Sequence, residues 1–339
     1  MRIRSNEEAA VLQDTAAAFG AADRIVLAVS GGLDSMVLLH AACSVRPGQL
    51  KSMIVATFDH RSGPHSAPAT RFVERYARKM GLRCVVGRAE HALTREHEWR
   101  EARWTFLRSV ASTFHGSVAT AHTVDDQVET VFMRILRDAG PRGLAGLYAE
   151  SEVLRPFLNL RRADLADYAR EHGVRFLDDP SNESRAHLRN RVRHEILPAI
   201  SRLNPAFSSD LLSIAQASAG WRNALAAAVE KIGTPAPRGA LRVARADLVG
   251  YDAESLRTLW PAVAAKAGVV MDRRGTHRLA EFTIKGHTGS SIQLSGGIEV
   301  RMFRDHLLIQ RWDARRVEMI RKARLSPATA RASARAEIW

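Results

Sequence analysis

The chain has 339 residues, 46% of them hydrophobic and 25% charged, and its 50 Lys and Arg against 36 Asp and Glu give a formal net charge of +14. That length allows two or three domains with a substantial core, and its two cysteines exclude a disulfide framework or a Cys-x-x-Cys metal site. The positive charge is typical of a protein that meets phosphates, while the lack of a long apolar segment, behind the basic start or elsewhere, favours a cytoplasmic protein over a secreted or membrane-spanning one.

Short apolar segments alternate with amphipathic ones through the first two hundred residues. The apolar segments predict strands at 25–29, 53–58, 84–86, 117–121 and 153–157. Segments with the 3.6-residue period of a helix lie between them, for example at 36–43 and 69–80. This order predicts an α/β fold with a doubly wound parallel sheet that is covered by helices on both faces.

The rest of the chain has a different pattern. Residues 204–233 are helical without strands, and the segment Gly-Thr-Pro-Ala-Pro-Arg-Gly at 233–239 is interpreted as a linker. Alternating apolar residues on both sides of a Gly-Gly turn at 290–303 predict a hairpin in a small α+β domain. After Asp313, seven basic residues against two acidic ones favour a mobile tail. We therefore expect four parts, at 1–203, 204–238, 239–313 and 314–339.

The first predicted strand ends in Ser-Gly-Gly-Leu-Asp-Ser at 30–35, directly before a helical pattern. Backbone N–H groups at a helix N-terminus bind anions, and glycines let the backbone approach closely and adopt positive φ. The spacing is neither the Walker P-loop nor G-x-G-x-x-G. A glycine turn with Asp34 or Ser35 as a helix cap is the simpler alternative. The full string after a five-residue apolar strand favours a phosphate-binding loop.

The fourth predicted strand is followed by Ala-His-Thr-Val-Asp-Asp-Gln-Val-Glu-Thr at 121–130. At 100° per residue, His122, Asp126 and Glu129 share one helix face. A capping box, with Thr123 as the cap and Asp126 three residues on, is the simpler alternative. Carboxylates at the carboxyl edge of a parallel sheet face the crevice where such folds bind ligands, so we expect a cationic group or Mg²⁺ there.

A third group of polar residues lies between 153 and 198. It contains an Arg-Pro pair at 155–156, an Asp-Pro-Ser-Asn turn at 179–182 and the run Arg-Asn-Arg-Val-Arg at 189–193. A helical stretch with several arginines is often only a solvated face, which is the simpler interpretation for each of them.

The three motifs together, in this order over about 24–198, resemble the tRNA(Ile)-lysidine synthetases, a family within the N-type ATP pyrophosphatases with the adenine nucleotide alpha hydrolase-like fold. The segment Arg-Glu-Ala-Arg-Trp at 100–104 is similar to the family's A-R-x-A-R-Y element, with Trp in place of Tyr. A departure lies at 58–70, Phe-Asp-His-Arg-Ser-Gly-Pro-His-Ser-Ala-Pro-Ala-Thr, where the family usually has V-D-H-G-L-R.

The resemblance implies a ligase that joins free L-lysine to C2 of the wobble cytidine of isoleucine tRNA with a CAU anticodon. ATP first adenylates the C2 oxygen and pyrophosphate leaves; the lysine amine then displaces AMP, so the implied co-substrate and cofactor are ATP and Mg²⁺. Two alternatives stay open. One is another tRNA-modifying ATP pyrophosphatase such as a thiolase, although Cys43 in a predicted helix and Cys84 in a predicted strand do not suit a catalytic pair. The other is a nucleotide-binding module or a small-molecule amide synthetase.

The resemblance also assigns residues. It places the pyrophosphate of ATP on Ser30, Gly31, Gly32, Leu33, Asp34 and Ser35 and the adenine near Phe58 and His60. It implies a catalytic set of Asp34, His122, Asp126 and Glu129, with Mg²⁺ on Asp34 and Asp126 and the lysine at Asp126 and Glu129. It implies contacts to tRNA or phosphate from Arg103, Arg155, Arg189, Arg191 and Arg193. The C-terminal domain is expected to contact tRNA, and the sequence leaves both a monomer and a homodimer open.

Overall fold

The computed structural model describes residues 6–311 except 62, 64–65, 91–95, 179–187 and 296. The Asp-Pro-Ser-Asn turn at 179–182 and the basic tail at 314–339 therefore lie outside the described residues. The chain divides into two compact units, Met1–Ala219 and Gly220–Trp339, which are described separately. The four-part division with boundaries at 203, 238 and 313 stays a prediction.

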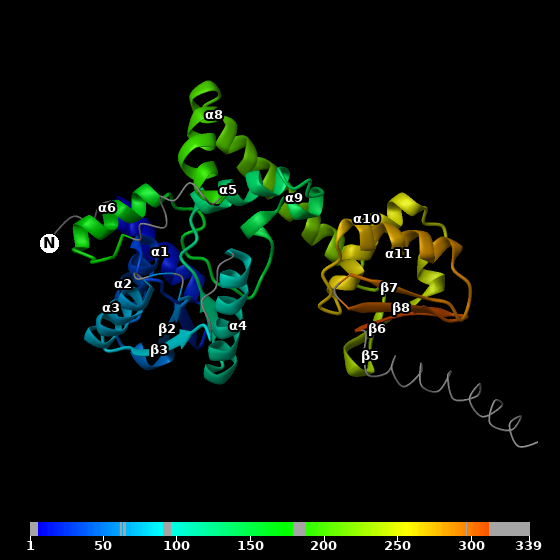
Figure 1. Cartoon of the computed structure of the whole chain (residues 1–339), viewed down its shortest axis with the longest axis horizontal. Coiled ribbons are helices and arrows are strands. Elements are labelled where there is room, and N and C mark those ends of the chain that lie inside the picture. Colours follow the sequence, from blue (N-terminus) through cyan, green and yellow to red (C-terminus); the bar gives the residue numbers. More distant parts are fainter. Residues whose placement is uncertain are drawn as a thin grey trace, which may run out of the picture. The chain divides into compact units, whose positions relative to one another are not determined.

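The first unit is built on a parallel sheet of four strands in the order β3-β2-β1-β4. Figure 1 labels β2 and β3 of this sheet among the helices of the unit. The strands are β1 (Ile25–Ala28), β2 (Met53–Asp59), β3 (Arg83–Arg88) and β4 (Ser117–Ala119). Ile25 lies opposite both Met53 and Ser117, so β1 is central. The apolar, buried sequences of β1 and β2 are those of strands covered on both faces, which confirms the predicted doubly wound parallel sheet.

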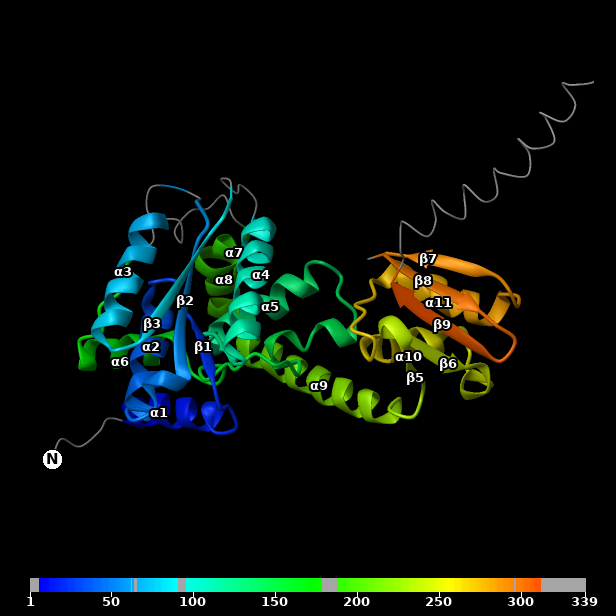
Figure 2. The same cartoon turned by 90° about the horizontal axis from the view of Figure 1, so that it is seen from below.

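Alternate residues of β1 and β2 belong to different cores. Leu27 and Val55 pack with the helices α1 (Asn6–Phe19), α2 (Leu33–Val45), α3 (Ser66–Lys79) and α6 (Arg162–His172). Val26 and Ile54 pack instead with α4 (Glu96–Phe114). Because successive side chains of a strand point to opposite faces, four helices cover one face of the sheet and α4 covers the other (Figure 2).

A third core joins α5 to the helical segments that follow residue 187. Val131 of α5 (Val124–Ile135) packs with Val192 of the π-helical turn Val192–Ile196 and with Leu211 of α9 (Phe207–Ala228). The short helices α7 (Leu188–Arg191) and α8 (Leu197–Leu203) flank that turn. This packing brings the arginine run at 189–193 beside α5, more than fifty residues earlier in the chain.

Two sequence interpretations are corrected. The predicted strand at 153–157 is reduced to one isolated parallel bridge between Ala119 and Leu154, because Pro156 has no N–H with which to extend a ladder. The segment 233–239 is not a linker: Thr234–Ala236 forms β5 and pairs antiparallel with β6 (Ala240–Ala244). Pro235 is tolerated within β5 because this strand lies at the edge of its sheet.

The second unit contains a five-stranded antiparallel sheet in the order β5-β6-β9-β8-β7. The predicted hairpin is present as β7 (Ser291–Leu294) and β8 (Ile298–Met302), followed by β9 (His306–Arg311). Helices α10 (Ala253–Ala265) and α11 (Arg273–Lys285) pack around the buried Trp260, which donates a hydrogen bond to Thr283 at 3.0 Å. The predicted small α+β domain is confirmed. None of the helices in the described ranges is both long and apolar enough to cross a membrane.

Candidate functional site

A cavity of about 570 Å³ opens in the first unit at the carboxyl ends of β1, β2 and β4. This edge is where open α/β sheets bind ligands, and the volume suits a small molecule. Twelve of the predicted site residues line it: Ser30, Gly32, Leu33, Asp34, Ser35, Phe58, His60, Arg103, His122, Asp126, Arg189 and Arg193. Four do not: Gly31, Glu129, Arg155 and Arg191.

The loop 30–35 is closed around the hydroxyl of Ser35. The Ser35 Oγ accepts hydrogen bonds from the backbone N–H groups of Ser30 at 3.1 Å and Gly31 at 3.2 Å, and it donates to the Gly32 carbonyl at 2.9 Å. Gly31 has φ +98°, a conformation that other residues rarely adopt. The N-cap of α2 is Gly32, not Asp34 or Ser35, and it offers no side-chain cap. First-turn N–H groups of α2 are therefore left for an anion.

Asp34 lies in this first turn and is only partly paired. Its Oδ1 is 3.5 Å from the Nε of Arg162, and among the described residues that buried oxygen has no hydrogen-bond partner. Burial raises the pKa of Asp34 to about 6, although the charges of Arg162 and Arg193 act in the opposite direction. The carboxylate thus keeps an unused acceptor atom in the cavity.

Asp126 and Glu129 form a dense cluster with two arginines, called here the acid–arginine cluster. Asp126 Oδ1 accepts from the Nη2 atoms of Arg189 at 3.3 Å and Arg193 at 3.1 Å. Glu129 Oε2 accepts from Arg189 Nε at 2.8 Å and Arg193 Nη2 at 3.0 Å, and Arg193 Nε donates to Oε1. The two carboxylates are three residues apart on α5, and the two arginines are four residues apart in the helical segment 188–196. Residues at these spacings share a helix face, so both carboxylates can meet both guanidiniums. Only 3% of the Glu129 side chain is exposed.

Asp126 is at the same time a capping residue. Its Oδ2 accepts from the Thr123 backbone N–H at 3.0 Å, and the Asp126 N–H donates to Thr123 Oγ1 at 3.4 Å, so the capping box suggested by the sequence is confirmed. Burial alone would raise the pKa of Asp126, but the Thr123 N–H and the positive charges of Arg189 and Arg193 hold it below its ordinary value. Asp126 is therefore a stable anion.

The two histidines of the cavity are neutral near pH 7. Burial lowers the pKa of His122 to about 4, and its Nδ1 lies 2.8 Å from Thr120 Oγ1. Burial, assisted by Arg103, lowers the pKa of His60 to about 4, and its buried Nδ1 has no partner among the described residues. The expectation that His122 lies on a helix face was wrong, because α5 begins at Val124 with Thr123 as its cap.

The remaining predicted arginines have different surroundings. Arg103 lines the cavity, and burial together with the charges of Arg100 and Arg189 lowers its pKa. Arg155 donates to Ser151 Oγ at 2.7 Å, away from the cavity lining. Arg191 is two residues from Arg189, hence on another side of the helix, and approaches Glu195 at 3.9 Å. Contacts of these arginines with RNA stay a prediction.

The sequence interpretation missed Arg162, Arg100, Trp104 and Asn190 as cavity residues. One signal could have identified Arg162. It is the first residue of α6, where a positive charge opposes the helix dipole, so local helix preferences do not explain it. Arg100 and Trp104 lie one helical turn apart in α4, within the same segment 100–104 as Arg103.

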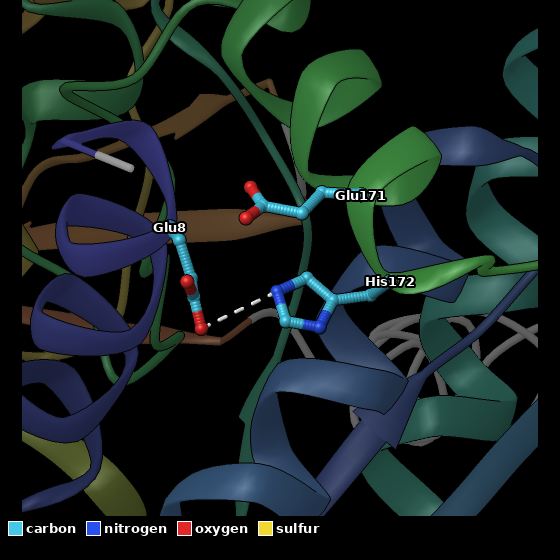
Figure 3. A group of neighbouring side chains, drawn as sticks. All are labelled: Glu8, Glu171 and His172. Atoms are coloured by element: carbon cyan, nitrogen blue, oxygen red, sulfur yellow. Dashed lines mark ion pairs between the residues drawn. The ribbon is translucent and has the colours of Figure 1, made fainter. Parts of the chain in front are cut away.

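A second group of ligand-type side chains lies outside the cavity lining, between α1 and α6 (Figure 3). The ligand atoms of Glu8, Glu171 and His172 lie within 4.8 Å of one another. His172 Nε2 is 3.5 Å from Glu8 Oε1, which joins the two helices. Glu171 is exposed and His172 is only half-buried, so this group is described as a helix contact rather than a metal centre.

Comparison with known proteins agrees with this geometry. The PP-loop domain family matches residues 4–200. The tRNA(Ile)-lysidine synthase of Thermosipho africanus is 33% identical over 199 residues, which are 56% of this chain and 47% of that protein. The synthase of Geobacter sulfurreducens is 37% identical over 226 residues, 63% of this chain and 48% of that protein. The chain thus spans about half the length of the curated relatives it matches.

The similarity to a solved structure concerns the fold and not the function. The U34-tRNA thiolase NcsA from Methanococcus maripaludis, determined with its 4Fe–4S cluster, has a TM-score of 0.50 and 12% identity over 62% of this chain and 78% of that one. The match to the PP-loop domain covers more than half of the chain and includes loop 30–35, the cavity and the acid–arginine cluster. The chain therefore belongs to the PP-loop family, and this membership implies the use of ATP.

Proposed function

We propose that the protein is a tRNA(Ile)-lysidine synthase. It uses ATP to join free L-lysine to C2 of the wobble cytidine of isoleucine tRNA with a CAU anticodon, and it releases AMP and pyrophosphate. The observation that carries the proposal is that an acid–arginine cluster shares one cavity with a phosphate-binding loop. Identities of 33% and 37% to two tRNA(Ile)-lysidine synthases over this part of the chain support it.

The first half-reaction needs a bound triphosphate. The N-terminus of α2 offers backbone N–H groups to its oxygens. Mg²⁺ prefers carboxylate oxygens, and Asp34, with a buried oxygen that lacks a hydrogen bond, fits this requirement. Both oxygens of Asp126 are already engaged by Thr123 and the arginines, so Asp126 fits less well. When bound, Mg²⁺ supplies charge neutralisation on the leaving pyrophosphate.

The base of the nucleotide is assigned to the end of β2. Phe58 and His60 lie with their ring centroids 4.9 Å apart and form an uncharged aromatic wall. The unpartnered Nδ1 of His60 can exchange a hydrogen bond with a purine nitrogen or amine. An adenine ring placed here leaves its phosphates directed toward the loop 30–35, at the end of the neighbouring strand β1.

The second half-reaction needs an amino acid. A lysine zwitterion carries two ammonium groups and one carboxylate, and the acid–arginine cluster contains charges of both signs. A free lysine amine has a pKa of about 10.4, so it must lose a proton before it attacks. We assign Asp126 and Glu129 as the carboxylates that bind this ammonium and accept its proton, which requires the ammonium to replace some of their contacts with Arg189 and Arg193. His122, with a pKa of about 4, is neutral and has no charge with which to attract the ammonium, so we assign it no such role here.

The substrate RNA suits the charge of the molecule. A net charge of +14 favours a polyanionic partner, and Arg100 and Arg103 lie along the cavity. We assign further tRNA contacts to the C-terminal unit. The proposal leaves both a monomer and a homodimer open. Because tRNA, ATP and free lysine occur together in the cytoplasm, the proposal also places the enzyme there.

A tRNA thiolase is the second candidate. Iron–sulfur clusters are held by cysteine thiolates, and the thiolase with the similar fold carries such a cluster. Here Cys43 is buried within α2 and Cys84 lies in β3, and neither lines the cavity. The lysine-transferring reaction is therefore favoured.

The test is an AMP-release assay with isoleucine tRNA transcript, labelled ATP and each amino acid in turn. The proposal predicts that lysine alone sustains turnover and becomes attached to the tRNA. A transcript with uridine at the wobble position is the matched control and should give neither AMP nor attached lysine. Turnover that is independent of lysine, or attachment to the control transcript, would contradict the proposal.

A further inference from the structure

Arg162 is a cation in the cavity that the proposed chemistry has not yet used. Its Nε lies 3.5 Å from Asp34 Oδ1, beyond hydrogen-bond length for this oxygen, and 38% of its side chain remains exposed. It lines the same cavity as Ser30 and Gly32 of the phosphate-binding loop. A partly exposed ion pair of this length contributes little to stability, so holding Asp34 is a poor explanation for the position of Arg162.

The helix that carries Arg162 is fixed along its length. At its start, the Arg162 backbone N–H donates to Asp125 Oδ2 at 2.8 Å. In its middle, the buried Tyr168 hydroxyl lies 2.9 Å from His40 Nδ1 on α2. At its end, His172 approaches Glu8 of α1 (Figure 3). The base of the Arg162 side chain is therefore held rigidly beside the loop, while its guanidinium is only loosely engaged.

Two features at this place favour an anion larger than a carboxylate. The first turn of α2 presents backbone N–H donors that no side chain caps. A guanidinium has a planar fork that pairs with two phosphate oxygens at once, whereas its present contact with Asp34 is single and long. An arginine at the first position of a helix is also unfavourable for the helix itself, so the stability of α6 does not explain its position.

We propose that Arg162 binds the pyrophosphate part of the nucleotide and is paired with Asp34 only in the unliganded protein. This inference rests on the proposed use of ATP. A divalent cation that arrives with the phosphates takes the Asp34 carboxylate, and the phosphate oxygens take the guanidinium. Each charge then keeps an opposite partner, so the exchange leaves no buried charge uncompensated.

The test uses calorimetric binding of two probes, magnesium pyrophosphate and AMP, to the full chain. Arg162→Ala should weaken pyrophosphate binding by about tenfold or more, the loss typical of one charge-assisted pair, and should leave AMP binding unchanged. Arg162→Lys should restore part of the affinity, because it keeps the charge but not the fork. Arg161→Ala is the matched control: its side chain is exposed, and its capping contact with Asp164 uses the backbone N–H.

The outcomes separate this inference from the proposed function. If the wild-type chain binds neither magnesium pyrophosphate nor ATP, the proposed function fails. If the wild type binds and Arg162→Ala binds pyrophosphate equally well, only the role of Arg162 fails. Equal losses for pyrophosphate and AMP would also overturn it, because they would indicate general damage. Arg162→Gln, which is close in size, provides a second reading should Arg162→Ala unfold at lower temperature.

Discussion

The loops that follow β1 and β4 reach the same edge of the sheet, and each presents an aspartate in the first turn of a helix. Asp34 follows β1 and has one ion pair at 3.5 Å, and its burial raises its pKa to about 6. Asp126 follows β4 and accepts hydrogen bonds on both oxygens, and its pKa is held below the ordinary value despite burial.

The difference shows that hydrogen-bond donors and nearby positive charges, and not burial alone, set the protonation state of a carboxylate. Both side chains are withdrawn from water, which by itself disfavours the charged form. Only Asp126 has enough donors to reverse that effect. Asp34 is thus the carboxylate with capacity for an added cation, and Asp126 belongs to a cluster that is assembled before any ligand arrives.

The largest effect is expected from Asp34→Asn. The variant keeps the shape but loses the charge, so AMP formation should fall by about 100-fold or more, as for other lost electrostatic groups. Pyrophosphate release at saturating ATP and tRNA measures it. Thermal stability should not fall, because a carboxylate with a raised pKa is destabilised by the fold. Near-normal release would remove Asp34 from the phosphate site. Ser30→Ala should also abolish AMP formation if loop 30–35 binds the phosphates.

A smaller, more selective effect is expected from Glu129→Gln. Removing this charge should lower the rate of lysine transfer by about 100-fold, the usual contribution of a positioned base. Lysine incorporation at several lysine concentrations measures it. Glu195→Gln is the matched control, because Glu195 is not part of the cavity lining and lies 3.9 Å from the half-exposed Arg191. A wild-type rate and apparent affinity in Glu129→Gln would show that Glu129 only holds the arginines.

The contributions of Asp34 and Asp126 to folding stability should change with pH in opposite directions. The fold raises the pKa of Asp34 from 3.8 to about 6, so protonated Asp34 adds stability to the folded state. This contribution is complete below the unfolded pKa of 3.8 and is lost as the pH rises through about 6. Asp126, with a lowered pKa, adds stability that is complete above that unfolded value and is lost as the pH falls below it. Unfolding temperatures of Asp34→Asn and Asp126→Asn, each compared with wild type across pH, measure this. Differences of the same sign would contradict the comparison. AMP formation should also decline below pH 6 as Asp34 gains a proton.

The smallest effect concerns RNA binding and salt. Neutralising an arginine that contacts phosphate should lower the slope of log K against log salt by about one unit. Arg191→Ala should show this change if Arg191 meets RNA, since 53% of its side chain is exposed. Arg193→Ala should change the slope less, because Asp126 and Glu129 already compensate its charge. Affinity that does not depend on salt would remove the physical basis for an RNA substrate.

Local features of the molecule were predictable from the sequence. The strand, turn and helix around 25–45 depend on an apolar run and two glycines, and the capping box of Thr123 and Asp126 depends on residues three apart. Contacts across the fold were not. Glu129 meets Arg189 sixty residues away, and Arg162 reaches Asp34 only because α6 packs on α2. The edge strand β5 was missed because proline is typical of linkers and is also tolerated at sheet edges.

The most direct test is a single-turnover reaction on isoleucine tRNA with labelled ATP and labelled lysine, in which tRNA-bound AMP and tRNA-bound lysine are followed separately. The account predicts that Asp34→Asn forms neither product, and that Glu129→Gln forms tRNA-bound AMP and does not convert it to lysine-bearing tRNA. Attachment of lysine by Glu129→Gln at the wild-type rate, or an equal loss of both products in the two variants, would contradict the division of the cavity into a phosphate site and a lysine site.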